Sequence, residues 1–171
     1  MTKSAEVGDE KKADAQALKA LAFVRVLVGK MQMDVEANFA PDDGESTPDE
    51  IRIEIEGPDA GRIIGKKGNV LDAIQYLAAR VVVRPGEPRR HLIVDAEGYR
   101  ARHEDQLSQM AKRLAERVAS EGKVITFDPM SARDRRVVHI ALKEITGVRT
   151  ESNGEGPDRR VQIIPVRAPG A

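Results

Sequence analysis

The apolar positions in the first third of the chain repeat with two different spacings. From Ala13 they follow a helical spacing, and we expect this helix to end near Gly29, because a glycine often closes a helix. Its apolar stripe consists of Leu18, Leu21, Ala22, Val24 and Val28. Apolar and polar residues then alternate over 34–39 and, most strictly, over 51–56. This alternation predicts two strands with the turn-rich segment 41–50 between them.

Helical spacing returns at Asn69, after the short run 61–68. One face of this second helix carries Val70, Leu71, Ile74, Leu77, Ala78 and Val81. Prolines and a glycine make 84–90 a connection, and 91–95 is predicted to be a short strand. The expected order is therefore helix, strand, strand, short helix, loop, helix and strand.

The remainder of the chain again mixes helices and strands. A long helix is predicted over 99–120, and a strand is predicted over 124–127. The apolar stripe of the long helix consists of Leu107, Met110, Leu114 and Val118. Its other positions include the basic residues Lys112, Arg113 and Arg117, which we expect on the surface.

A further helix is expected to begin at Asp128 and Pro129, which are typical of an N-cap and of the first helical position. We expect it to end at Thr146, before a glycine. Its buried side should hold Val137, Val138, Ala141, Leu142 and Ile145. Two strands, 148–150 and 159–165, follow with a polar turn between them.

These elements divide into two mixed α/β (α+β) domains, each with helices packed on a three-stranded sheet. We expect a disordered N-terminus over 1–12, a first domain over 13–97, a second domain over 98–167 and a short tail over 168–171.

Charge is distributed unevenly although the formal net charge is zero, with 28 basic and 28 acidic residues. Residues 1–50 carry 6 basic and 11 acidic side chains, residues 51–97 carry 8 and 7, and residues 98–171 carry 14 and 10. Positive potential is therefore concentrated towards the C-terminus. The chain has no cysteine, no signal-peptide pattern and no apolar run long enough to cross a membrane. We expect a cytoplasmic protein without membrane insertion.

The strongest chemical signal is the run GRIIGKKG, residues 61–68, whose last four positions are Gly65, Lys66, Lys67 and Gly68. The glycines permit close approach and positive φ, and the lysines and the following helix N-terminus supply positive potential, so the loop is expected to grip phosphate. A nucleotide-triphosphate loop needs four residues between its first glycine and its Gly-Lys pair, followed by Ser or Thr. Here the spacing is three and Lys67 replaces the hydroxyl, which argues against ATP or GTP.

In its setting between a short and a long helix, this run resembles the GxxG loop of a type II KH domain, which clamps single-stranded nucleic acid. The resemblance covers about 13–97 and implies that Lys66 and Lys67 contact phosphates, with Arg62 beside them, while Gly65 and Gly68 permit close approach. It also implies that Ile63 and Ile64 help to wall an apolar groove for the bases.

In the second domain Arg135 and His139 are four residues apart and are expected to lie one above the other on a helix. This Arg-x-x-x-His pattern, with a basic strand pair behind it, is similar to the small α/β domain named for that Arg and His, a binder of single-stranded nucleic acid. The resemblance implies nucleic-acid contacts for these two residues and for their basic neighbours, Arg136, Lys143, Arg159 and Arg160. A solvated charge pair would explain the bare motif equally well.

The tandem of a KH-like and an Arg-x-x-x-His domain resembles the Jag (KhpB) family of bacterial RNA-binding proteins. The resemblance implies a non-enzymatic binder of single-stranded RNA, a post-transcriptional regulator or RNA chaperone linked to cell elongation and division. It also implies pairing with a smaller KH-only protein or self-association. Many members begin with a basic N-terminal domain and a long linker, which this sequence is expected to lack, so envelope-associated roles are not carried over.

None of the three histidines has the sequence neighbours that a metal site or a catalytic site requires. His103 and Glu104 begin like a zinc-protease motif, but Leu107 occupies the place of the second histidine. His91 has no metal ligand nearby in the sequence, and no nucleophile can be assigned to His139. We expect no catalytic residues, no metal and no cofactor. Two alternatives stay open, a KH-mediated protein-interaction scaffold and a binder of single-stranded DNA.

Overall fold

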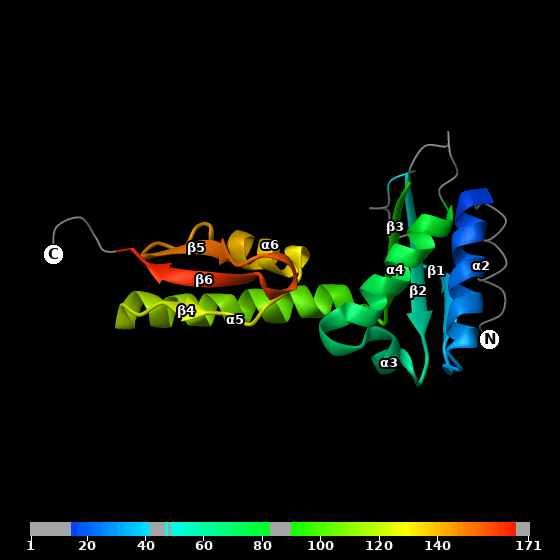
Figure 1. The fold of residues 1–171 in the computed structure, drawn as a ribbon, viewed down its shortest axis with the longest axis horizontal. Helices are drawn as coiled ribbons and strands as arrows, with labels where there is room; N and C mark the ends of the chain where they lie inside the picture. Colours follow the sequence, from blue (N-terminus) through cyan, green and yellow to red (C-terminus); the bar gives the residue numbers. More distant parts are fainter. Residues whose placement is uncertain (1–14, 42–46, 48, 83–89, 167–171) are drawn as a thin grey trace. The chain divides into compact units, whose positions relative to one another are not determined.

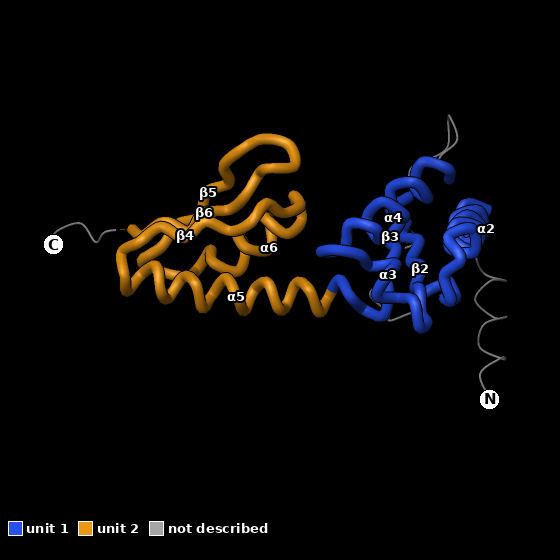
Figure 2. The backbone as a smooth tube through the Cα atoms, turned by 60° about the horizontal axis from the view of Figure 1, so that its bottom comes forward, with its two compact units in different colours: residues 1–100 blue, residues 101–171 orange. Residues whose placement is uncertain are grey.

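The computed structural model describes residues 15–41, 47, 49–82 and 90–166. The chain divides into two compact units, 1–100 and 101–171 (Figure 2). The N-terminus, the tail and most of the connection 84–90 that the sequence suggested lie outside the described residues.

The first unit has the element order that the sequence predicted (Figure 1). Its elements are α2 (Ala15–Lys30), β1 (Glu36–Phe39), β2 (Glu50–Glu56), α3 (Ala60–Ile64), the 3-10 helix η1 (Lys66–Gly68), α4 (Asn69–Val82) and β3 (His91–Ala96). The sheet order is β1-β2-β3, with β1 antiparallel and β3 parallel to β2. Both β1 and β3 are therefore edge strands.

The core of the first unit lies between one face of this sheet and the helices α2 and α4. The alternation along β2 is confirmed, because Ile51, Ile53 and Ile55 are buried. Their cross-strand neighbours on β1 and β3, Ala37 and Val94, are buried on the same face. Period-two alternation therefore gave the correct buried side of this sheet.

The helical stripes in this unit were predicted only in part. On α2 the buried residues are Ala17, Ala20, Leu21, Val24 and Val28, and on α4 they are Leu71, Ile74, Ala78 and Val82. The expected members Leu18, Ala22, Leu77 and Val81 are exposed. The reason is that a helix buries only one face, and Leu18 projects roughly 100° away from the centre of the buried stripe on α2.

α2 ends at Lys30, close to the predicted end, but Gly29 does not close it, since this glycine lies inside the helix. The left-handed residue after the helix is Gln32, with φ of 55°. The amide of Met33 donates to the carbonyl of Val28, a bond that closes the last turn.

The second unit places two helices against an antiparallel sheet of order β4-β6-β5. Its elements are α5 (Tyr99–Glu121), of which the first two residues belong to the first unit, β4 (Ile125–Thr126), α6 (Ala132–Leu142), β5 (Val148–Asn153), the 3-10 helix η2 (Gly156–Asp158) and β6 (Arg160–Pro165). On α5 the buried residues are Leu107, Ala111, Ala115 and Val118. Met110, expected in this stripe, is 45% exposed, because it lies roughly 100° around the helix from the centre of the buried stripe.

The helix expected over 129–146 is shorter at both ends. The prediction that Asp128 caps it is wrong: the N-cap is Ser131, whose hydroxyl accepts from the amide of Asp134 at 3.1 Å. Residues 127–130 are not helical because the amides of Phe127 and Met130 donate to carbonyls on and next to β6. The helix ends at Leu142. The amides of Lys143 and Ile145 donate to carbonyls three residues earlier, at Ile140 and Leu142, which is 3-10 bonding and not α-helical bonding.

Candidate functional site

The GKKG loop lies between α3 and α4 and has a specific backbone shape. Gly65, Lys67 and Gly68 all have positive φ, at 69°, 54° and 79°. The side chains of Lys66 and Lys67 are exposed, whereas Gly68 is buried. The loop therefore presents two lysines to solvent on a tightly turned backbone that precedes the N-terminus of α4.

The two glycines are required by packing within the unit. A Cβ atom added to Gly65 would overlap the side chain of Val70, and one added to Gly68 would lie 2.9 Å from Cε1 of Tyr99. Side-chain bulk at either position is incompatible with the folded loop. The glycines thus shape the loop whether or not a ligand approaches it, which the sequence alone did not indicate.

The three residues before the loop have different environments. Ile63 is 0% exposed and belongs to the core, so its expected role as a wall of a base-binding groove is wrong. α3 has only five residues and buries Ala60 and Ile63, so Ile63 anchors this short helix to the core. Ile64 is half-buried and packs against that core, so it keeps some accessible surface.

Arg62 is exposed and its guanidinium lies 3.3 Å from the carboxylate of Asp59. Asp59 also accepts from the backbone amide of Asp34 at 2.9 Å. The amide bond and Arg62 hold the pKa of the Asp59 carboxyl below its usual value. Arg62 is therefore held at the base of the loop by a carboxylate.

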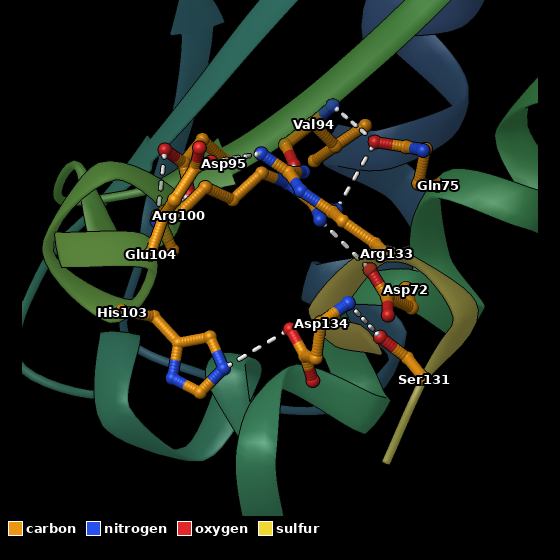
Figure 3. Close-up of polar contacts among 11 residues, drawn as sticks. Asp72, Gln75, Val94, Asp95, Arg100, His103, Glu104, Ser131, Arg133 and Asp134 are labelled. Carbon is orange, nitrogen blue, oxygen red and sulfur yellow. Dashed lines mark hydrogen bonds and ion pairs between the residues drawn. The ribbon is translucent and has the colours of Figure 1, made fainter. Parts of the chain in front are cut away.

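A polar network covers the outer edge of β3 in the first unit (Figure 3). Gln75 accepts from the amide of Val94 at 3.0 Å, and Arg100 donates to the carbonyl of the same residue at 2.9 Å. Arg100 also donates to Gln75 at 3.1 Å and pairs with Asp72 at 2.9 Å. Its side chain is only 11% exposed. These side chains satisfy backbone groups that an edge strand would otherwise present to solvent.

In the second unit Arg135 and His139 lie on α6, as predicted. The ring of His139 is held on both sides: Nδ1 lies 2.6 Å from the hydroxyl of Thr150, and Nε2 lies 2.8 Å from the hydroxyl of Ser152. Arg135 donates to the carbonyl of Met130 at 3.1 Å. Neither hydroxyl residue was expected at the site, because the predicted strand ended at Thr150 and Ser152 fell in the polar turn after it. Their spacing of two on a strand was the available signal.

Burial lowers the pKa of His139, and the nearby guanidinium groups of Arg135 and Arg159 lower it further. Both effects favour the neutral form of the imidazole. Among the predicted site residues, the structure brings together His139, Arg135 and Arg159.

The other three basic residues of the predicted site, Arg136, Lys143 and Arg160, lie outside the group formed by His139, Arg135 and Arg159. Arg136 on α6 and Lys143, which directly follows this helix, are exposed, and Lys143 lies 3.9 Å from the carboxylate of Glu144. Arg160 donates to the carbonyl of Asp158. The charges that act on His139 are those of Arg135 and Arg159, and these three residues add positive charge elsewhere on the second unit.

The other two histidines are engaged with carboxylates. Nε2 of His103 lies 3.2 Å from Asp134, a buried residue of α6 (Figure 3), and His91 lies 3.7 Å from Glu50 at the surface. Within the described residues, no group of three or more His, Cys, Asp and Glu side chains is arranged to hold a metal ion. None of the helices described in the structure is both long and apolar enough to span a bilayer.

Comparison with known proteins identifies both units. Residues 19–94 match the KH domain of the KhpA/KhpB type, and residues 105–165 match the domain that takes its name from the Arg-x-x-x-His motif. These matches confirm the two expected domain types and their order.

Three curated relatives bear the name RNA-binding protein KhpB. The protein of Clostridium symbiosum is 33% identical over 85% of this chain and 64% of its own length. That of Streptococcus pneumoniae is 31% identical over 86% and 43%, and that of Bacillus subtilis is 34% identical over 66% and 55%. The chain thus spans between 43% and 64% of the length of these relatives.

Proposed function

Because the chain belongs to the KhpB (Jag) family, whose KH and Arg-x-x-x-His domains it carries in that order, we propose that it binds single-stranded RNA through both units. The observation that carries this proposal is the exposure of Lys66 and Lys67 on a loop whose backbone is fixed by two glycines. Such a loop brings two cations close to a phosphodiester backbone without rearrangement.

The second unit supports the same function with a different group of residues. Arg135 and Arg159 supply positive charge around His139, and Arg136, Lys143 and Arg160 extend it over the surface. The two units are consecutive in the chain. When one unit holds an RNA strand, the other unit is present at a high effective concentration near that strand. The whole chain therefore binds more tightly than either unit alone.

We expect single strands to be preferred over duplexes, because a short loop cannot reach the base edges in the deep major groove of an A-form helix. The chain has only three Phe and two Tyr residues and no Trp. Recognition is therefore expected to rely on the backbone more than on stacking platforms, with modest sequence preference. From the family we infer a cytoplasmic post-transcriptional regulator or RNA chaperone linked to cell elongation and division.

The test is a charge reversal of the loop in the whole chain, Lys66→Asp with Lys67→Asp. RNA affinity should fall by about tenfold or more, because two phosphate contacts are replaced by repulsion. A matched control, Lys30→Asp with Lys123→Asp, makes the same change in net charge at exposed positions, one in each unit. Affinity is measured by fluorescence anisotropy with an unstructured uridine-only RNA.

The proposal fails if loop variant and control bind equally well while both keep the wild-type circular dichroism spectrum. Competition with a duplex RNA and with a DNA strand of the same sequence tests the choice of polymer. Preference for the DNA strand would favour a single-stranded DNA binder.

A second candidate function, a protein contact through the KH unit, is favoured by exposed apolar side chains. On α4 these include Tyr76, 59% exposed, and Leu77, 46% exposed, and on α2 they include Val26. We propose that this surface pairs with a smaller KH-only protein of the KhpA type or with a second copy. Light scattering of the wild type and of Leu77→Lys, with and without such a protein, tests it. Masses that stay monomeric in every mixture would reject this candidate.

A further inference from the structure

Both nitrogen atoms of His139 are already occupied in the folded chain. Nδ1 is bonded to the hydroxyl of Thr150 and Nε2 to the hydroxyl of Ser152, at 2.6 and 2.8 Å. A neutral imidazole has one donor and one acceptor nitrogen, and a hydroxyl serves either of them. Because both contacts are satisfied at once, the ring has no nitrogen left with which to bind a phosphate.

The two hydroxyl groups are placed at the margin of the core. Thr150 pairs with Ile163 and Ser152 pairs with Val161, and both partners are buried on β6. Paired residues share a face of the sheet, so the hydroxyls lie on the face covered by the helices. They belong to β5, an edge strand, and both residues are only half-buried. The cluster is thus attached to the core and still reaches solvent.

The charges that act on this cluster come from two sides. Arg135 approaches from α6, and Arg159 approaches from the segment before β6. The charged residues of β5, Arg149 and Glu151, alternate with the two hydroxyl residues and therefore lie on the other face of the sheet, where they pair with each other. The helix-covered side of the cluster is consequently dominated by guanidinium groups.

Resting on the RNA-binding function proposed above, we propose that Thr150 and Ser152 are the residues that donate hydrogen bonds to an RNA phosphate in the second unit. His139 is then a positioning residue that orients their hydroxyl groups. Arg135 and Arg159 attract the phosphate to this position.

The number of available donors depends on the protonation of His139. With a neutral ring, one hydroxyl accepts from the ring N–H and keeps its own proton for a phosphate oxygen, while the other donates its proton to the bare nitrogen. With a protonated ring, both hydroxyls accept from the imidazole, so both of their protons become available. Proton uptake therefore adds one donor and one positive charge to the site.

This coupling has a definite sign. A bound phosphate offsets the two guanidinium groups that disfavour protonation, so the pKa of His139 is higher in the complex than in the free protein. Binding then takes up protons, and RNA affinity must increase as the pH falls through the interval between the two pKa values. A residue that served only the fold would not link RNA affinity to proton uptake in this way.

The experiment measures affinity of the whole chain for uridine-only RNA between about pH 8 and about pH 5.5, the range in which histidine titrates. The variants are Ser152→Ala, Thr150→Val, which keeps the side-chain shape, and His139→Gln, which keeps a polar group that does not titrate. Ser120→Ala is the matched control, because the hydroxyl of Ser120 donates to a carbonyl within α5 on the exposed surface.

Ser152→Ala and Thr150→Val are expected to lose about threefold to tenfold in affinity each, the worth of one hydrogen bond, with Ser120→Ala unchanged. The wild type should gain affinity towards acid pH, and His139→Gln should lose about threefold or more of that gain. The proposal is overturned if both hydroxyl variants bind like the wild type and His139→Gln keeps the full pH dependence. Absence of RNA binding by the wild type at every pH would instead overturn the proposed function, and this inference with it.

Discussion

The ring of Tyr99 packs directly against Gly68, so that a Cβ atom on Gly68 would lie 2.9 Å from Cε1 of the ring. Tyr99 is the first residue of α5, whereas Gly68 closes the GKKG loop. Residues 31 positions apart in the chain therefore fix the shape of the loop together. The ring also packs against the core of the first unit, which connects the loop to the folded body of that unit.

Replacing Gly68→Ala is expected to lower the free energy of unfolding of the first unit by about 2 to 3 kcal/mol, since φ is 79° and the new methyl group meets Tyr99. Gly61→Ala is the control, because Gly61 lies within α3 with nothing within 4 Å of its added Cβ. That change should be neutral or stabilising by up to about 1 kcal/mol. Urea unfolding measures both, and equal stabilities would contradict the packing argument.

Arg100→Ala should destabilise the first unit by about 2 to 3 kcal/mol, because the carbonyl of Val94 loses its partner and a nearly buried side chain is removed. Arg113→Ala, an exposed change on α5, should stay within about 0.5 kcal/mol of the wild type. Hydrogen exchange localises the effect. We expect faster exchange of the Val94 amide, which bonds to Gln75, and unchanged exchange there would argue against the edge network.

Asp134→Ala should destabilise the second unit by about 1.5 to 3 kcal/mol, because the buried carboxylate accepts from His103 and links α6 to α5. Glu144→Ala removes a carboxylate that is almost fully exposed and only loosely paired with Lys143, so it should have little effect. Thermal unfolding of both variants compares the buried and the exposed contact. A similar melting temperature for the two would show that the His103 contact contributes nothing to stability.

Stability of the second unit should fall in mild acid through His139. Its folded pKa lies below its usual value, mainly because of burial and then because of Arg135 and Arg159. The unfolded chain therefore takes up the proton more readily, and this contribution is fully present above about pH 6.5 and is lost as the pH falls through the folded pKa. His139→Gln should remove this component, which appears as a smaller difference in urea midpoint between pH 7 and about pH 5. An unaltered difference would contradict it.

The salt dependence of RNA binding should become weaker when arginines of the second unit are removed. Each phosphate neutralised on a single strand contributes about −0.7 to the slope of log affinity against log salt, so Arg135→Ala with Arg159→Ala should make the slope shallower by about 1.4. The increase in affinity with RNA length should also be smaller in the double variant, because one of the two binding units that act on the same strand is weakened. A wild-type slope in the double variant would assign the second unit to a protein partner instead.

Local periodicity and turn chemistry were enough to predict several elements of this fold. The alternation in β2 gave the correct buried face, because a strand has only two faces. The two glycines of the GKKG loop correctly predicted a break between two helices. Glycine tolerates positive φ, and Gly65 and Gly68 both have it in the structure. The spacing of Arg135 and His139 correctly put both on one helix.

The covered side of each helix, and the distant groups that come into contact, depend instead on how the elements pack together. A helix has a continuous surface, so its sequence does not say that Leu18 and Leu77 stay exposed while Ile63 enters the core. Asp128 and Pro129 predicted a helix start that the structure does not have. The backbone of residues 127–130 bonds to residues on and next to β6, so α6 has its N-cap at Ser131 instead. His139 meets Ser152 only because β5 pairs with β6 in one register beside α6, and Arg100 reaches Val94 only because β3 is an edge strand. These contacts depend on long-range pairing, which a local pattern does not encode.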